Sequence, residues 1–182
     1  MTADVAFNAI QARRVRPWVN EEEVRLGWIS ALENAPYFAI YNVGPYTFQP
    51  WKVVWPEMSS KFFAAVAGSS VVPGVGLRPF VPDHKIYFAS FNDREPAYYL
   101  CALLNAPMVK EWIEAHNVSI QVGDVFKHMN LPEYDPADPL HMQMAQLSEQ
   151  AHQTHNAAQR AAIVAQILPL TTAVLTAWVN RP

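Results

Sequence analysis

Short aromatic and β-branched runs mark the middle of the chain. The runs YFAIYNVG (37–44) and WKVVW (51–55) are separated by a Gly-Pro pair, which predicts a β-hairpin. The run KFFAAVAG (61–68) fits a third strand, although its alanines also allow a helical turn. The run HKIYFASF (84–91) predicts one more strand. A small sheet therefore occupies residues 37–91.

Helical spacing of apolar residues appears before and after this sheet. Residues 20–36 have Asn20 as a cap and three glutamates in the first turn, which predicts a helix that ends at Pro36. Residues 94–105 predict a second helix, and Pro107 fits the first turn of a third.

The last forty residues are strongly helical. From Leu140 to Val179 the pattern fits either two antiparallel helices or one long kinked helix, and Asp138 is the expected cap. Residues 68–83 instead hold three of the six glycines and three prolines, which predicts a loop of the length that is commonly functional.

These elements predict an α+β fold, with a small mixed or antiparallel sheet, flanking helices and a C-terminal helical segment. We divide the chain into an N-terminal arm and helix (1–36), an α/β domain (37–135) and the C-terminal helical segment (136–182).

The composition indicates that the protein contacts a partner and that it is located in a reducing compartment. Hydrophobic residues make up 51% of the 182 residues and charged residues only 16%, which argues against disorder and suggests that some apolar surface meets a partner. The single cysteine, Cys101, excludes an internal disulfide, so a cytoplasmic location and a buried structural thiol are expected. Pro169 and several polar residues interrupt the late apolar run, which we interpret as an amphipathic helix rather than a membrane span.

The residues do not assemble a recognisable active site or metal site. His152 and His155 are three residues apart and His141 lies on the same element, but there is no HExxH and no carboxylate at ligand spacing. We interpret these histidines as solvated residues of a helix surface. No serine, cysteine or threonine lies in a recognisable nucleophile motif.

The net charge of −3 gives no global case for binding nucleic acid, but basic residues gather locally. Residues 40–90 carry Lys52, Lys61, Arg78 and Lys85 against Glu57 and Asp83. Two interpretations of residues 45–68 stay open on this basis. The lysines either lie on the wet face of a hairpin whose aromatics build the core, or they contact the phosphates of a polyanion.

Four motifs in order add a family resemblance. They are VGPYTFQPWKVVW, VPDHKIYFASF, EPAYYLCALLNAPMV and SIQVGDVFKHMNLPEYDPADPLHMQMAQLSEQAH. From about Tyr37 to His152 the chain resembles the target-recognition region, or TaqI-like specificity domain, of N6-adenine DNA methyltransferases from type IIG and type I-like restriction-modification systems. The family's Lys-Val-Val-Trp falls on 52–55, its Pro-Asp-His-Lys on 82–85 and its Leu-Asn-Ser/Ala-Pro on 104–107. Pro56 departs from the pattern, because such sequences usually carry arginine there.

The resemblance implies a domain that binds double-stranded DNA and selects the sequence to be methylated. Together with the phosphate-binding interpretation of the basic residues, it leads us to expect DNA contacts from Gln49, Lys52, Trp55, Ser59, Ser60, Lys61, Arg78, His84 and Lys85. Arg78, in the predicted loop, is the expected guanine reader. The family's catalytic Asn/Asp-Pro-Pro-Tyr/Phe motif and glycine-rich S-adenosylmethionine loop are absent from the 182 residues. We therefore expect no enzyme activity and no cofactor in this chain, and we expect S-adenosylmethionine in a separate catalytic domain that is its partner.

An alternative function needs no DNA contact. The apolar residues from Ala161 to Val179 also suit a protein-interaction module that docks onto a methyltransferase or a sister subunit. Oligomerisation through the C-terminal helices stays open as well.

Overall fold

The computed structural model describes residues 44–83, 85–116 and 129–180. Nearly all of them belong to one compact unit, Tyr46–Pro182, which is described by itself. Its elements, in chain order, are the 3-10 turn η2 (Pro45–Phe48), the strands β1 (Trp51–Pro56), β2 (Ala65–Gly68), β3 (Ser70–Val72), β4 (Gly76–Arg78) and β5 (Ile86–Phe91), and the helices α4 (Arg94–Leu104), α5 (Pro107–His116), α6 (Pro139–Gln153) and α7 (Ala157–Val179).

The main sheet is antiparallel and has the order β2-β1-β5. Val53 pairs with Val66 of β2 on one side and with Ala89 of β5 on the other. The expected strand at 51–55 is confirmed, the strands expected at 61–68 and 84–91 form over Ala65–Gly68 and Ile86–Phe91, and the α+β fold class is confirmed. The expected strand at 37–44 lies almost wholly outside the described residues.

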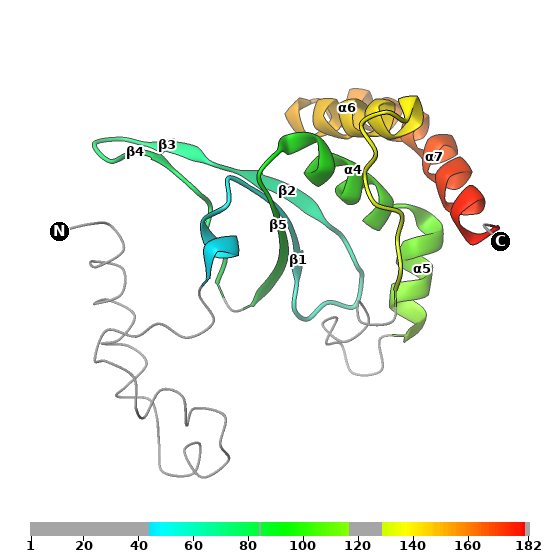
Figure 1. Ribbon diagram of the computed structural model, residues 1–182, viewed down its shortest axis with the longest axis horizontal. Helices are drawn as coiled ribbons and strands as arrows, with labels where there is room; N and C mark the ends of the chain where they lie inside the picture. Colours follow the sequence, from blue (N-terminus) through cyan, green and yellow to red (C-terminus); the bar gives the residue numbers. More distant parts are fainter. Residues whose placement is uncertain (1–43, 84, 117–128, 181–182) are drawn as a thin grey trace, which may run out of the picture. The chain divides into compact units, whose positions relative to one another are not determined.

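Side chains of one face of this sheet form the core with the helices. Val53 and Trp55 alternate along β1 with residues of the opposite face, and they pack with Tyr99 and Leu103 of α4. Helix α4 contacts all three strands, α6 packs on α4, and α7 packs mainly on α6 (Figure 1). The expected buried thiol is confirmed, because Cys101 on α4 is 1% exposed.

The C-terminal segment forms two helices, which decides between the two arrangements that the sequence allowed. The Asp138 carboxylate accepts a hydrogen bond from the Leu140 amide at 2.8 Å, so the expected cap of α6 is confirmed. Helix α6 ends at Gln153, and Asn156 caps α7 by accepting from the Gln159 amide. Pro169 lies inside α7 without ending it.

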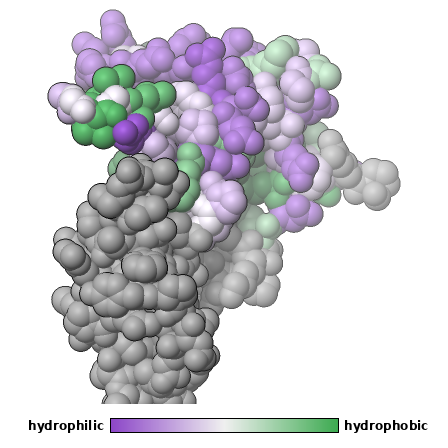
Figure 2. Space-filling model, turned by 60° about the vertical axis from the view of Figure 1, so that its left-hand side comes forward, coloured by the Kyte–Doolittle hydropathy of each residue, from purple (hydrophilic) through white to green (hydrophobic). Residues whose placement is uncertain are grey.

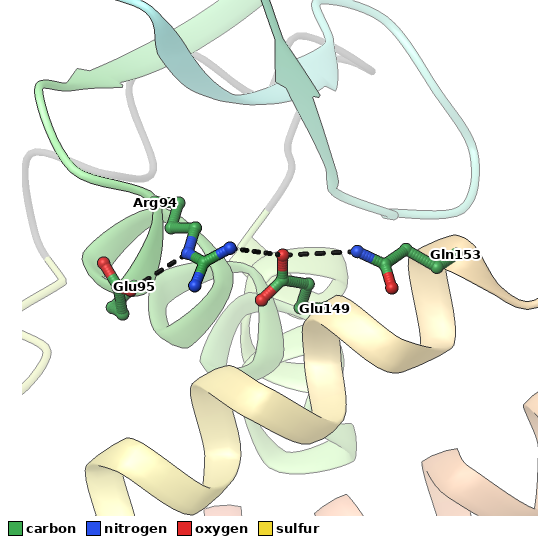
Figure 3. Close-up of polar contacts among 4 residues, drawn as sticks. All are labelled: Arg94, Glu95, Glu149 and Gln153. Carbon is green, nitrogen blue, oxygen red and sulfur yellow. Dashed lines mark hydrogen bonds and ion pairs between the residues drawn. The ribbon is translucent and has the colours of Figure 1, made fainter.

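A chain of polar contacts joins the first turn of α4 to α6 at the surface. Arg94 donates to Glu95 at 3.0 Å and to Glu149 at 3.3 Å, and Gln153 donates to Glu149 (Figure 3). The hydrogen bond from Arg94 lowers the pKa of Glu95. Exposed ion pairs of this kind add little to stability, so packing rather than charge holds α6 on α4.

The prediction of a loop over 68–83 is wrong in part, because this stretch contains the hairpin β3–β4. Val71 pairs with Leu77, and Ser70 pairs with Arg78. The Val75 amide donates to the Val72 carbonyl at 3.0 Å across Pro73 and Gly74. Gly74 has a φ of 75°, as the third position of a type II turn requires.

The interpretation of His141 as a solvated residue is also wrong. His141 is 6% exposed, and its Nδ1 accepts a hydrogen bond from the Asp135 amide. Because Nδ1 is an acceptor, Nε2 carries the proton and lies 3.2 Å from the Tyr99 hydroxyl. His141 therefore joins the connector before α6 to the core.

Candidate nucleic-acid interface

Lys52 does not project to solvent as the sequence suggested. Its side chain is fully buried on the sheet face opposite α4, and its ammonium donates to the Gln49 carbonyl at 2.7 Å. The ammonium also lies 5.8 Å from the centre of the Phe88 ring. Burial lowers the pKa of Lys52, because desolvation disfavours the charged form. Within the described residues Lys52 is a structural lysine of the sheet.

Two further residues of the expected DNA-binding set, Trp55 and Gln49, also contribute to the fold. Trp55 is 9% exposed and belongs to the hydrophobic core. Gln49 is half-buried, and its backbone carbonyl is the acceptor for Lys52. Pro56, where the family pattern has arginine, is the last residue of β1 and pairs with Ile86.

The loop between β1 and β2 carries exposed residues. Ser59 is half-buried, and its hydroxyl accepts from the Lys61 amide and donates to the Lys61 carbonyl, which fixes the backbone at Lys61. Ser60 and Lys61 are exposed. Among the described residues, the Lys61 ammonium has no ion-pair or hydrogen-bond partner.

Lys85 lies at the same end of the sheet as this loop. It is exposed, and its ammonium lies 3.5 Å from the Glu57 carboxylate, while the Glu57 amide donates to the Lys85 carbonyl. The Asp83 side chain accepts from the Lys85 amide. The positive charge of Lys85 is thus largely balanced by its neighbours, and His84 lies outside the described residues.

Arg78 lies at the other end of the sheet. It is exposed on β4, and among the described residues its guanidinium donates only to the Leu77 carbonyl. The hairpin begins next to the paired residues Trp51 and Gly68, at one end of β1. The pair Pro56 and Ile86 lies five residues further along β1, at its other end. At about 3.4 Å per residue the two ends are roughly 17 Å apart. The structure therefore brings Ser60 and Lys61 to the same end of the sheet as Lys85 and leaves Arg78 at the opposite end.

Two exposed features were missed at the sequence level. The hairpin exposes Val71, Val75 and Leu77, which are 76%, 52% and 63% exposed. Hydrophobic residues gather where this hairpin comes forward (Figure 2). The second feature is Phe63, which is 56% exposed next to the buried Phe62. Continuing the alternation of β2 back from Ala65 would have placed Phe63 outward.

A groove of about 460 Å³ opens among α4, α6 and α7. Its walls include alanines of α4 and α6 and the apolar Val164, Ile167 and Leu168 of α7. Among the described residues, two cations, Lys110 and Arg160, line it, and no carboxylate does. A groove of this size and lining suits an apolar ligand or side chains that carry a negative charge at one end.

Cys101, His152 and Asn105 meet in this groove without forming a thiol nucleophile. The sulfur lies 3.8 Å from His152 Nε2 and 3.5 Å from the Asn105 amide nitrogen. However, His152 Nε2 already accepts from the Val66 amide, and its Nδ1 lies 2.7 Å from the Ser148 carbonyl. Burial raises the pKa of the Cys101 thiol to about 12, so the thiolate is not formed near neutral pH.

His152 instead has a structural contact that the interpretation as a solvated surface residue did not include. By accepting from Val66 it joins the end of α6 to β2, an edge strand of the described sheet. Within the described ranges, no group of three or more histidine, cysteine, aspartate or glutamate side chains could hold a metal ion.

Comparison with known proteins gives one informative match. Over 80 residues, 44% of this chain, the sequence is 32% identical to the type II methyltransferase M.NspV from Nostoc sp.. The match relates this chain to a methyltransferase. It spans 16% of the length of that protein. No family model matches the chain. No solved structure matches it either.

Helix α7 has the length and apolar composition of a membrane-crossing helix, and 22% of its most apolar window is buried in the unit. The same length and composition also occur in helices of soluble proteins that pack on a partner. Ile167, Val174 and Leu175 of α7 are buried in the unit, whereas Val164, Leu168 and Val179 stay exposed within the described residues.

Proposed function

We propose that this chain is the DNA sequence-recognition domain of a restriction-modification N6-adenine methyltransferase. In this role it binds duplex DNA and positions it for a catalytic domain that lies outside these 182 residues. The similarity to a type II methyltransferase and the TaqI-like order of motifs both support the proposal. S-adenosylmethionine would bind in the catalytic domain, and the cytoplasm is the proposed location.

The observation that carries the proposal is the hairpin β3–β4 with Arg78 at its base. Its two strands pack chiefly on each other and extend away from the main sheet (Figure 1). All six of their residues are exposed. The major groove of B-DNA admits a two-stranded β-ribbon of this kind. The Arg78 guanidinium has no carboxylate partner among the described residues, so it is available to donate two hydrogen bonds to a guanine.

The loop with Ser60 and Lys61 would supply the phosphate contacts. Its separation of roughly 17 Å from the hairpin corresponds to about half of one turn of DNA, so one duplex can reach both. Lys52 has no part in this proposal, because its ammonium is buried and bonded to Gln49.

A fluorescent-duplex titration of the full chain tests the proposal. We expect affinity to fall steeply with salt and Lys61→Ala to weaken binding to all duplexes similarly, because a phosphate contact carries no sequence information. Arg78→Ala should reduce the discrimination against the wrong base at one position of the DNA target by roughly 1–3 kcal/mol. Affinity that stays flat between low and moderate salt would contradict the DNA role.

A second candidate function is docking onto a methyltransferase catalytic domain, favoured by exposed apolar side chains of α7 beside the groove. Val164 and Leu168 are 41% and 37% exposed, and they border the groove that Lys110 and Arg160 line. Size-exclusion chromatography with light scattering, on this chain with and without the catalytic domain, measures the docking. Replacing Leu168 by Glu should weaken the complex, with Gln159→Glu on the exposed start of α7 as the control. Partitioning into lipid vesicles instead would assign α7 to a membrane surface.

A further inference from the structure

Phe63 is held in an unusual position for a large aromatic side chain. Phe62 and Ala64 on either side of it are 2% and 8% exposed, and both belong to the core, whereas Phe63 is 56% exposed. Val54 lies on the sheet face opposite α4, and its partner Ala65 lies on the same face. Phe63 is two residues before Ala65, which corresponds to this face as well. Continued back from Ala65, the alternation places Phe63 on the face opposite α4, and at Phe63 that face is open, because the side chain is 56% exposed.

The backbone is fixed on both sides of Phe63 by side chains from distant parts of the sequence. The Phe62 amide donates to the Glu114 carboxylate at 2.9 Å. The Asn105 side chain accepts from the Ala64 amide at 3.2 Å and donates to the Ala64 carbonyl at 2.8 Å. Since α4 and α5 hold both neighbours, Phe63 is presented on a rigid support rather than on a mobile loop tip.

The surroundings of Phe63 suit an anionic partner with flat apolar groups. Two residues before it, Lys61 carries an ammonium without a partner among the described residues, and Ser60 is exposed. Of the nearby carboxylates, Glu57 is paired with Lys85, and Glu114 accepts a hydrogen bond from the Phe62 amide and keeps its charge. A free cation beside a free aromatic ring is the combination with which proteins bind a nucleic-acid strand and stack on its bases.

We propose that Phe63 inserts against a base of duplex DNA at a step where the stack is opened. This inference rests on the proposed DNA-recognition function and names a residue that the sequence-level set did not contain. Apolar side chains inserted at base steps unstack them, and a ring fixed before binding loses little freedom on insertion. Lys61 would hold the adjacent phosphate while the ring of Phe63 covers the exposed face of the base.

The test compares two short duplexes of one sequence, one fully paired and one with a single abasic site beside 2-aminopurine. The full chain should bind the opened duplex roughly 10-fold more tightly, since a base–aromatic stack contributes affinity of this order. It should also change the 2-aminopurine fluorescence. Phe63→Ala should remove both effects and Phe63→Trp should keep them. Phe80→Ala is the matched control, because Phe80 is 40% exposed and lies after the hairpin.

The outcomes separate this inference from the function on which it rests. Equal binding of both duplexes by the unaltered chain, or a preference that survives Phe63→Ala, would overturn the role of Phe63 and leave DNA recognition standing. Absence of any duplex binding by the unaltered chain would overturn both. A change of oligomeric state in Phe63→Ala with unchanged DNA binding would assign Phe63 to a protein contact and overturn the insertion. Thermal melting of each variant verifies that it is folded.

Discussion

The β1–β2 loop (57–64) and the hairpin β3–β4 both expose apolar and basic side chains, but they are supported in opposite ways. Asn105, Glu114 and Ser59 fix the backbone of the loop through side-chain hydrogen bonds. The hairpin relies chiefly on its own three residue pairs and on the turn at Gly74. An isolated two-stranded hairpin is only marginally stable in water.

The loop and the hairpin would therefore contact a partner in different ways. The loop presents Lys61 and Phe63 in one geometry, which suits contacts that must be positioned before binding. The hairpin can adjust to the surface it enters, and burial of Val71 and Leu77 against a partner would add stability that it lacks alone. We therefore expect substitutions in the core to destabilise the loop. We expect the stability of the hairpin to change only when the hairpin itself is altered.

The largest effect is expected from Asn105→Ala, which should break the support of the loop. The variant loses the side chain that bonds both backbone groups of Ala64 and the Cys101 carbonyl, and it leaves half-buried polar groups without partners. We expect a loss of about 2–3 kcal/mol in the free energy of unfolding, measured by urea denaturation. The exposed Asn92→Ala is the control and should stay within about 0.5 kcal/mol. Equal losses in the two variants would mean that Asn105 does not hold the loop.

The thiol behind the loop gives an effect that depends on pH. Cys101 Sγ lies 3.5 Å from the Ala64 carbonyl, and the pKa of this thiol is about 12 when folded, against roughly 8.5 in an unfolded chain. As pH rises above 8.5 the unfolded state loses this proton while the folded state keeps it, so stability falls. Between pH 7 and pH 10 this difference in protonation should lower the free energy of unfolding by about 2 kcal/mol. Urea denaturation of Cys101→Ala should show a shallower decline over this range, and parallel declines would contradict the burial of the thiol.

A smaller and local effect is expected from Gly74→Ala in the hairpin. A methyl group there meets no atom within 4 Å, so the cost comes from the positive φ alone and should be about 1 kcal/mol. Amides of β3 and β4 should exchange hydrogen about fivefold faster, while the global unfolding midpoint stays unchanged.

The matched substitution in the main sheet should act differently. In Gly68→Ala the new methyl would lie 2.7 Å from the Trp51 ring, so the global midpoint should fall. A fall in the global midpoint of Gly74→Ala would show that the hairpin is coupled to the core after all.

The smallest effects on stability are expected from Lys61→Ala and Arg78→Ala. Both side chains are exposed, and in the part of the chain that the structure describes Arg78 bonds only to the adjacent Leu77 carbonyl. Each variant should unfold within about 0.5 kcal/mol of the unaltered chain in urea. A loss of DNA binding in either variant would then come from a lost contact with DNA, whereas a larger loss of stability would show that the residue serves the fold.

The hairpin shows where sequence patterns were insufficient. Glycine and proline between 68 and 83 were correctly taken as turn signals, but their density concealed two three-residue strands. The order Val72-Pro73-Gly74-Val75 is a type II turn signal between short β-branched runs, and it could have been found. The strands themselves are too short for periodicity to detect.

Lys52 shows a limit that no sequence signal would have removed. Its position between two core tryptophans predicts that it lies on the other face of the strand, and this is correct. That this face is covered at Lys52 depends on Gln49 supplying an acceptor and on Phe88 of β5 lying beneath the ammonium. The contact with Gln49 is local, whereas the contact with Phe88 arises only when β5 pairs with β1.

The sequence by itself determined the local elements: β1 and β5 from their aromatic and β-branched runs, α4 and α5 from helical spacing, and the start of α6 from Asp138. These depend on neighbours within a few residues, so the pattern contains them. Only the tertiary structure decided that Lys52 and His141 are buried, that Lys61 and Arg78 lie at opposite ends of the sheet and that Phe63 is fixed outward. The burial of His141 and the position of Phe63 depend on residues distant in sequence, Tyr99 for the first and Asn105 and Glu114 for the second. The placement of Lys61 and Arg78 depends on strand pairing, and the burial of Lys52 depends on β5 lying beside β1.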